Sequence, residues 1–205
     1  SLPPVGLYLH VPFCVSLCPY CDFVVYAGAA ARGPASRVDA FTAALLAEIT
    51  LRADVADAAF GRERIPLQSV YVGGGTPTLL ASASLASMLD LVRSRFGIAD
   101  GAEVTVEANP GPDERGSAAD LVAAGVNRLS LGAQAFDTGL LRRLGRRHRT
   151  EDVGAAVREA REAGIRLCIE TDSNLLPTAE IGRKILDELG DDWVQINYDP
   201  GNVVY

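Results

Sequence analysis

The stretch "GLYLHVPFCVSLCPYCDF", residues 6–23, joins a short apolar run to a loop that holds three of the chain's four cysteines. The apolar run at 6–11 predicts a β-strand. Cys14, Cys18 and Cys21 follow it with the spacing C-x3-C-x2-C, which is so close that the three thiols must bind or react together. We therefore expect a strand that carries three thiols to one end of a sheet.

Five further apolar runs predict strands, and stretches with apolar residues at three- and four-residue spacing predict helices between them. The strands are expected at 69–74, 103–108, 128–133, 166–171 and 193–199, and the helices at 38–56, 82–95, 117–124, 150–163 and 178–189. The expected helix caps are Ser117, Thr150 and Thr178 at the amino ends and Gly125, Gly164 and Gly190 at the carboxyl ends. The Gly- and Pro-bearing stretch 27–37 is expected to form a mobile loop.

Strands that alternate with helices predict an α/β fold with a parallel sheet. We expect a partial (βα)6-type barrel, because several strands end in polar or glycine-rich segments and the sites of (βα) barrels lie at those strand ends. The segments are "HVPFC", "GGGTPT", "EANP", "GAQAF", "ETD" and "NYDPGN". The sequence therefore predicts a site at the carboxyl ends of the strands.

The composition excludes several classes of protein. The 205 residues are 48% hydrophobic and 22% charged, which is ordinary for a globular domain whose core needs no disulfides. A net charge of −7 argues against a nucleic-acid binder. No apolar run approaches the ~20 residues that span a bilayer, and no secretion signal is recognisable at the start. We therefore expect a cytoplasmic protein, whose clustered cysteines are reduced and bind metal or react.

Three thiols suit an iron–sulfur cluster with one open iron, because a [4Fe–4S] cluster usually takes four thiolates. A zinc site would need His10 or Cys168 as a fourth ligand, but structural zinc sites favour two paired knuckles and only one is present. A redox pair of Cys18 and Cys21 would leave Cys14 unexplained. Three buried structural cysteines are the remaining alternative, and the density of the motif disfavours it.

The sequence "YLHVPFCVSLCPYCDF" resembles the signature of radical S-adenosylmethionine enzymes. More narrowly, it resembles the oxygen-independent coproporphyrinogen III oxidase-like group, which includes the coproporphyrinogen dehydrogenases and related haem chaperones. The likeness runs from about residue 5 to residue 168 and includes "VYVGGGTPTLL", "VEANP", "RLSLGAQAFD" and "LRRLGRRHR".

The resemblance implies a [4Fe–4S] cluster on Cys14, Cys18 and Cys21, with S-adenosyl-L-methionine bound to the open iron. The implied reaction is reductive cleavage of S-adenosyl-L-methionine to a 5′-deoxyadenosyl radical, in porphyrin or haem metabolism. The implied partners are an electron donor such as flavodoxin or ferredoxin and a small-molecule substrate of the tetrapyrrole type.

The resemblance also implies a set of cofactor contacts: Tyr8, Tyr20, Gly74, Gly75, Thr76, Glu107, Gln134 and Arg146. The residues by themselves leave ordinary alternatives open. The glycines would then form a tight turn, Glu107 would be a solvated strand end, and the tyrosines would be packing aromatics. His10 is expected to be a hydrogen-bonding partner rather than a ligand. The neighbouring Arg142, Arg143, Arg147 and Arg149 are expected to form a solvated basic patch, with steering of an acidic substrate as the alternative.

Beyond residue 168 the likeness changes. The family's ribose-binding Asp falls on Thr171, flanked by Glu170 and Asp172. The segments "LLPTAE" and "VQINYDPGNVVY" resemble metal-dependent sugar isomerases and epimerases of the xylose-isomerase-like TIM barrels. That second resemblance implies Mg²⁺ or Mn²⁺ bound by Glu170 and Asp199.

The two resemblances together predict a hybrid of two barrel families. Residues 1–168 would form a partial barrel of the radical S-adenosylmethionine type, and residues 169–205 a sugar-isomerase-like segment that continues the same domain. The alternative functions are a sugar isomerase or epimerase fragment, a non-catalytic scaffold, and a haem chaperone-like protein.

Overall fold

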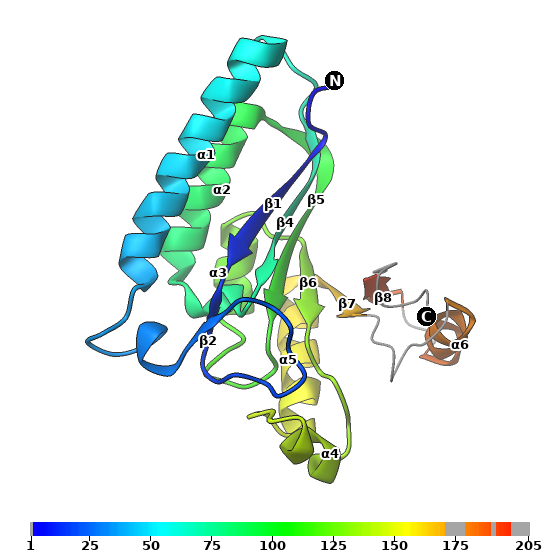
Figure 1. Ribbon diagram of the computed structural model, residues 1–205. Helices are drawn as coiled ribbons and strands as arrows, with labels where there is room; N and C mark the ends of the chain where they lie inside the picture. Colours follow the sequence, from blue (N-terminus) through cyan, green and yellow to red (C-terminus); the bar gives the residue numbers. More distant parts are fainter. Residues whose placement is uncertain (1, 171–178, 190–191, 198–205) are drawn as a thin grey trace.

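The computed structural model describes residues 2–170, 179–189 and 192–197. Its main feature is a six-stranded sheet with the order β1-β4-β5-β6-β7-β8, in which every neighbouring pair is parallel (Figure 1). The strands are β1 Gly6–Val11, β4 Leu67–Gly74, β5 Ile98–Ala108, β6 Arg128–Leu131, β7 Arg166–Glu170 and β8 Val194–Asn197. The predicted parallel α/β architecture is confirmed, and all six expected strands are present. Strand β1 has the predicted bounds, whereas β4 and β5 begin earlier and β6 ends earlier than predicted.

The helices are α1 Val38–Phe60, α2 Ser82–Phe96, α3 Ala118–Ala123, α4 Thr138–Arg143, α5 Thr150–Ala163 and α6 Ala179–Leu189. Two short 3-10 turns, η1 Gly28–Ala30 and η2 Pro77–Leu79, follow the cysteine loop and β4. Helices α1 and α2 lie side by side along β1, β4 and β5 (Figure 1). The sequence did not predict α4, and the stretch 27–37 contains η1. No helix among the described residues is long and apolar enough to cross a membrane.

The predicted amino-terminal caps have mixed outcomes. Ser117 is confirmed, because its hydroxyl accepts a hydrogen bond from the Asp120 N–H at 3.3 Å. The prediction that Thr150 caps a helix is wrong. Thr150 is the first residue of α5, and its hydroxyl donates to the Phe136 carbonyl at 2.8 Å. A side chain committed to that loop cannot cap the helix. Thr178 lies outside the described residues.

Two of the predicted carboxyl-terminal glycines end their helices as expected. Gly164 is the C-cap of α5 with a φ of 83°, and Gly125 follows α3 with a φ of 93°. Both conformations lie in the left-handed region, which glycine adopts without steric cost. Gly190 lies outside the described residues.

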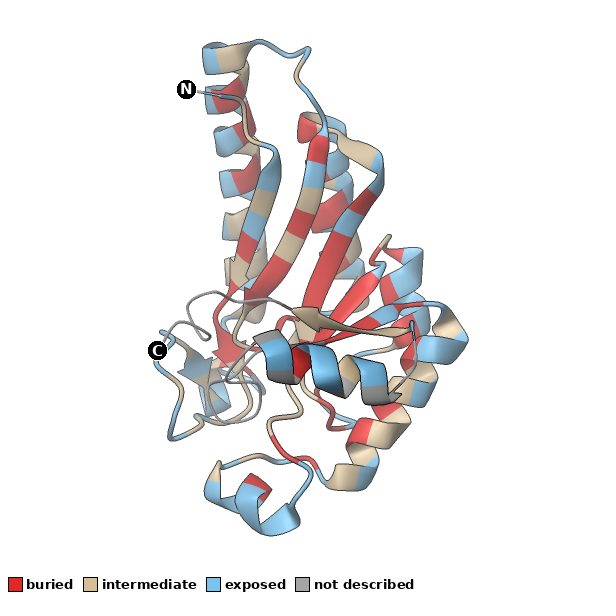
Figure 2. Ribbon diagram, turned by 90° about the vertical axis from the view of Figure 1, so that its right-hand side faces the viewer, coloured by how far each residue is buried: buried red, intermediate tan, exposed pale blue. Residues whose placement is uncertain are grey.

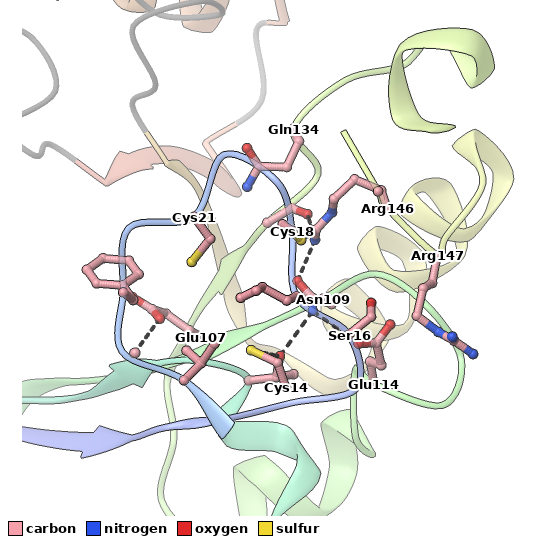
Figure 3. Close-up of a pocket in the computed structure, with 18 of the residues that line it drawn as sticks. Cys14, Ser16, Cys18, Cys21, Glu107, Asn109, Glu114, Gln134, Arg146 and Arg147 are labelled. Carbon is pink, nitrogen blue, oxygen red and sulfur yellow. Dashed lines mark hydrogen bonds between the residues drawn. The ribbon is translucent and has the colours of Figure 1, made fainter. Parts of the chain in front are cut away.

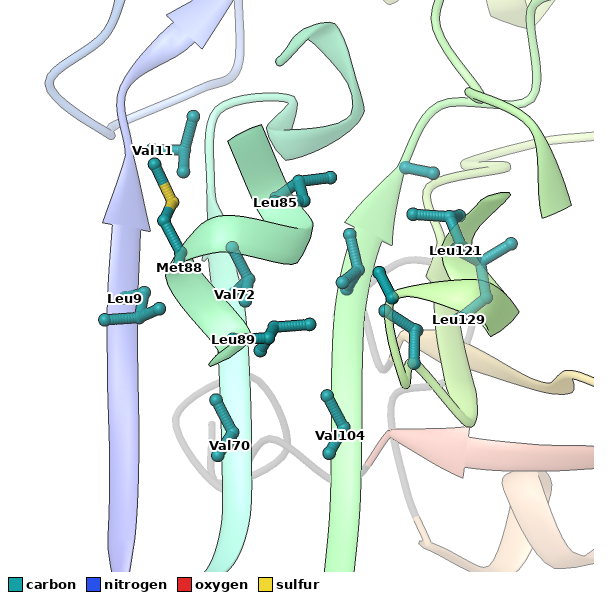
Figure 4. Close-up of a cluster of buried hydrophobic side chains, with 14 of the residues drawn as sticks. Leu9, Val11, Val70, Val72, Leu85, Met88, Leu89, Val104, Leu121 and Leu129 are labelled. Atoms are coloured by element: carbon teal, nitrogen blue, oxygen red, sulfur yellow. The ribbon is translucent and has the colours of Figure 1, made fainter. Parts of the chain in front are cut away.

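The hydrophobic core lies between the sheet and its helices, because apolar side chains of β1, β4, β5 and β6 point to the helix-covered face (Figures 2 and 4). The register aligns Leu9 of β1 with Val72 of β4, and Val72 with Val106 of β5. Helix α2 packs on this face with side chains that are almost fully buried: Leu85, Met88 and Leu89. This packing fixes the strands in register and therefore fixes where their carboxyl ends meet.

The opposite face of the sheet carries polar side chains and forms the inside of the partial barrel. Tyr71, Thr105 and Arg128 are register neighbours on β4, β5 and β6. The Arg128 guanidinium donates to Glu103 at 3.2 Å and to the Thr105 hydroxyl at 3.3 Å, and it also donates to the Asn197 side chain of β8. A sheet face that helices cover must be apolar, and here the polar side chains lie on the other face.

We expect the substitution Leu89→Ala to lower the free energy of unfolding by ~2–5 kcal/mol, since it opens a cavity between α2 and the sheet. Urea denaturation followed by circular dichroism measures this change. Leu51→Ala is the control, because Leu51 of α1 is 61% exposed, and it should change the stability by less than ~0.5 kcal/mol. Equal losses in the two variants would contradict the assigned core.

Candidate functional site

A pocket lies where the cysteine loop meets the carboxyl ends of β4, β5 and β6 (Figure 3). Its walls come from the loop after β1, the glycine turn after β4, the end of β5 and the segment 130–147. The predicted site residues that line it are Cys14, Cys18, Tyr20, Cys21, Gly74, Gly75, Thr76, Glu107, Gln134 and Arg146. Segments far apart in the sequence thus converge on one pocket, as the parallel topology predicts.

The cysteine loop is fixed at its base. Strands β2 Phe13–Cys14 and β3 Tyr26–Ala27 pair with each other, so the two ends of the loop meet. Phe13 is buried and packs edge-on against Phe41 of α1, with ring centroids 5.2 Å apart. Cys14, Cys18 and Cys21 are free thiols that are each partly buried. Burial raises the pKa of the Cys14 thiol, although a hydrogen bond from Thr76 acts in the opposite direction.

The glycine turn after β4 lies directly against the cysteine loop. The Gly75 N–H donates to the Val11 carbonyl at 2.8 Å, and the Thr76 N–H donates to the Phe13 carbonyl at 2.7 Å. A Cβ atom on Gly75 would lie 2.6 Å from the Phe13 carbonyl oxygen, and one on Gly74 would lie 2.5 Å from the His10 ring. These approaches leave no room for side chains, so glycine is required here for a steric reason.

Glu107 has specific partners at the end of β5. One carboxylate oxygen accepts from the Tyr71 hydroxyl at 2.8 Å, and the other accepts from the Gly74 N–H at 2.8 Å. Burial raises the pKa of Glu107, while these two hydrogen bonds act in the opposite direction. The alternative of a solvated strand-end carboxylate is therefore wrong.

Arg146 reaches the pocket from the segment after α4. Its guanidinium donates to the Gly132 carbonyl at 2.7 Å, to the Cys18 sulfur at 3.6 Å and to the Tyr20 hydroxyl at 3.4 Å. The pKa of Tyr20 is raised to about 12, chiefly by burial, although the Arg146 charge lowers it. Gln134 has a φ of 64°, an uncommon conformation for a residue other than glycine and one that often marks a functional site.

Two polar pocket residues, Asn109 and Glu114, were not predicted. Asn109 donates to the Thr76 hydroxyl at 3.1 Å and to the Glu114 carboxylate at 3.3 Å, and it accepts from Arg146 (Figure 3). Glu114 is only 6% exposed. The position of Asn109, two residues after Glu107 at the end of a strand, was a signal that could have identified it.

Tyr8 does not line this pocket. It lies on β1, where its ring stacks on Tyr71 with centroids 6.0 Å apart and its hydroxyl is 3.0 Å from His10 Nδ1. His10 thus has the expected hydrogen-bonding role. Cys168 is also outside the lining; it is buried in β7 and donates to the Leu129 carbonyl at 3.3 Å.

The four neighbouring arginines lie at the surface. Arg142, Arg143, Arg147 and Arg149 are all exposed, as expected of a solvated patch, and Arg147 also lines the pocket. The side chain of Glu170 and the whole of Thr171, Asp172 and Asp199 lie outside the described residues. The proposed Mg²⁺ or Mn²⁺ site therefore stays a prediction.

The chain is similar to known proteins over most of its length. Residues 8–180 match the model of the Radical SAM superfamily. The chain is 42% identical over 166 residues to "Heme chaperone HemW" of Escherichia coli (strain K12), which covers 81% of this chain and 41% of that protein. It is 43% identical over 157 residues to the protein of the same name from Mycobacterium tuberculosis (strain ATCC 25618 / H37Rv), covering 77% of this chain and 38% of that protein.

A solved structure supports the same relationship. The coproporphyrinogen III oxidase HemN from Escherichia coli, described as a radical SAM enzyme, superposes with a TM-score of 0.69 and 30% sequence identity. The match covers 92% of this chain and 42% of that chain. The chain thus spans about two fifths of the length of these relatives.

Proposed function

This chain belongs to the radical S-adenosylmethionine superfamily, in its coproporphyrinogen III oxidase-like group, and we propose that its pocket binds a [4Fe–4S] cluster together with S-adenosyl-L-methionine. The proposed cluster ligands are Cys14, Cys18 and Cys21. The observation that carries the proposal is the convergence of three free thiols, a glycine turn and several polar side chains on one pocket.

One observation on the pocket fits these groups. Arg146 Nε and Ser130 Oγ are buried atoms of lining residues, and within the described chain they have no hydrogen-bond partner. A bound ligand would satisfy such atoms.

A cluster held by Cys14, Cys18 and Cys21 would supply the electron for the reductive cleavage of S-adenosyl-L-methionine. The chain's own residues bind and orient that cofactor. Gly74, Gly75 and Thr76 let the backbone approach its methionine part closely. Arg146 is the proposed clamp for its carboxylate through Nε–H, which is buried and unpaired within the described chain, whereas both terminal nitrogens already donate to other residues. Glu107, Gln134 and Tyr20 are the proposed contacts to its remaining polar groups, with Tyr8 as a further predicted contact outside the described pocket.

The cleavage reaction tests the proposal. The anaerobically reconstituted chain, incubated with S-adenosyl-L-methionine and dithionite, is expected to release 5′-deoxyadenosine, which chromatography of the nucleosides detects. In the cell an electron donor such as flavodoxin or ferredoxin would replace dithionite. A chain that carries the cluster and yet binds no S-adenosyl-L-methionine would overturn the assignment of the pocket.

We expect Arg146→Leu to weaken S-adenosyl-L-methionine binding by about tenfold to a hundredfold, because a lost hydrogen bond to a charged group is worth ~1.5–3 kcal/mol. Isothermal titration of the cluster-loaded chain measures the dissociation constant. The matched control is Arg143→Leu in α4, since Arg143 is exposed and outside the pocket lining. An equal loss of affinity in both variants would show that the overall charge of the chain, and not a hydrogen bond from Arg146, determines the affinity for S-adenosyl-L-methionine.

A second candidate function is haem binding. Relatives that are 42% and 43% identical carry the name heme chaperone, whereas the coproporphyrinogen III oxidase structure is 30% identical. We therefore propose haem, rather than a porphyrinogen substrate, as the tetrapyrrole partner of a longer protein of this type. Titration of haem into the chain, followed by its Soret absorption band, tests whether residues 1–205 contain that site. Oxidative decarboxylation of coproporphyrinogen by the chain would instead favour the oxidase function.

A further inference from the structure

Within the described part of the chain, the sulfurs of Cys14 and Cys18 have hydrogen-bond donors that come from outside the cysteine loop. The Thr76 hydroxyl donates to the Cys14 sulfur at 3.7 Å, and the Arg146 guanidinium donates to the Cys18 sulfur at 3.6 Å. Thr76 is 1% exposed, so its hydroxyl cannot exchange this partner for bulk water. The donors reach the loop from the glycine turn after β4 and from the segment after α4.

Asn109 holds both donors in place. Its side-chain nitrogen donates to the Thr76 oxygen at 3.1 Å and thereby occupies an acceptor site of that hydroxyl. The hydroxyl proton is then directed to the Cys14 sulfur. The side-chain oxygen of Asn109 accepts from the Arg146 guanidinium, and Glu114 fixes the amide orientation by accepting from the same nitrogen at 3.3 Å.

We infer that Thr76 and Arg146, positioned by Asn109, raise the reduction potential of the cluster by donating hydrogen bonds to the sulfurs of Cys14 and Cys18. The inference rests on the proposed function, in which these cysteines bind the cluster. Reduction adds one electron, so donors on the thiolate sulfurs stabilise the more negative, reduced state more than the oxidised state. Asn109 touches no sulfur and acts only through the two donors, so it is a positioning residue.

The test is a redox titration with dithionite, followed by electron paramagnetic resonance, of anaerobically reconstituted chain without S-adenosyl-L-methionine. Thr76→Val keeps the shape of the side chain and removes the donor to Cys14. We expect the equilibrium constant for reduction to fall by about tenfold, a shift of ~59 mV to more negative potential for a one-electron couple. Thr76→Ser keeps the hydroxyl and should keep the potential of the parent chain.

The matched control is Thr105→Val, which removes another buried hydroxyl. Thr105 is 0% exposed and bonds to Glu103 and Arg128 on the polar face of the sheet, without contact to a cysteine. The cluster of the Thr105→Val variant should have the same reduction potential as the cluster of the parent chain. Equal shifts in Thr76→Val and Thr105→Val, or an unchanged potential in Thr76→Val, would overturn the inference.

Asn109→Ala carries the same test if Thr76→Val loads too little cluster to titrate. We expect Asn109→Ala to make the reduction potential of the cluster more negative, as Thr76→Val does. The double variant Thr76→Val/Asn109→Ala should shift the reduction potential by less than the sum of the two single shifts, because both changes act on the same hydroxyl. An unchanged potential in Asn109→Ala would overturn its positioning role. A parent chain that binds no cluster would refute the proposed function itself, whereas a parent with a cluster and variants with the same potential would refute only this inference.

Discussion

Alanine at any one of Cys14, Cys18 and Cys21 should abolish cluster binding. Each thiolate is expected to bind a different iron, and the remaining two would leave half of the cluster without protein ligands. The parent chain, reconstituted anaerobically, should hold ~4 iron and ~4 sulfide per chain and show the broad thiolate-to-iron absorption band. Each of the three variants should lose the band and the iron, as measured by absorption and by metal analysis.

Cys168→Ala is the control for this experiment. Cys168 is the fourth cysteine of the chain, buried at 1% exposure in β7 and outside the pocket lining. Its variant should bind as much iron as the parent chain. Full iron content in a variant of Cys14, Cys18 or Cys21 would remove that residue from the ligand set, and a loss in Cys168→Ala would add a fourth ligand.

Gly75→Ala should destabilise the chain and weaken S-adenosyl-L-methionine binding. The added Cβ would lie 2.6 Å from the Phe13 carbonyl oxygen and 2.9 Å from the Phe13 nitrogen, and both are backbone atoms that cannot rotate away. The turn and the cysteine loop must therefore separate, at a cost of ~1–3 kcal/mol that is typical of overpacking. If that cost falls on the bound state, the affinity for S-adenosyl-L-methionine falls by about fivefold to a hundredfold. Denaturant melts and calorimetric titration measure the two effects.

Gly154→Ala provides the matched control. Gly154 lies within α5, where its added Cβ would meet only the end of the flexible Arg158 side chain at 3.4 Å. Alanine is the better helix former by ~1 kcal/mol, so this variant should be as stable as the parent or more stable. A Gly75→Ala variant that behaved in the same way would show that the close contact between the turn and the loop is not essential.

Much of the fold could be predicted because its signals are local. The alternation of apolar residues in "GLYLHV" and "SVYVGG" reflects one strand face on the core, and the structure places both segments in the sheet. Helix α4 was missed because its sequence, "TGLLRR", holds only two apolar side chains, which are adjacent and show no helical period. Thr150 was misplaced as a cap because its hydroxyl bonds to a carbonyl fourteen positions away in the chain.

The site was predicted in part of its members but not in the contacts between them. The cysteine spacing and the resemblance identified ten of the residues that line the pocket. They did not identify Asn109 as the residue that joins Arg146 to Thr76, nor the buried Glu114 beside it. The boundary at residue 168 and the function of residues 169–205 stay predictions, as do the two carboxylates expected to bind Mg²⁺ or Mn²⁺.

By itself, the sequence determined the six strands, their parallel α/β arrangement and the presence of three neighbouring thiols. Those properties depend on the spacing of residues close together in the chain. Only the tertiary structure decided that Arg146 donates to the sulfur of Cys18, 128 positions away, and that the Gly75 backbone touches Phe13. Such contacts depend on the register in which β1, β4, β5 and β6 are held, and that register follows from the packing of the core against α2 rather than from any single segment.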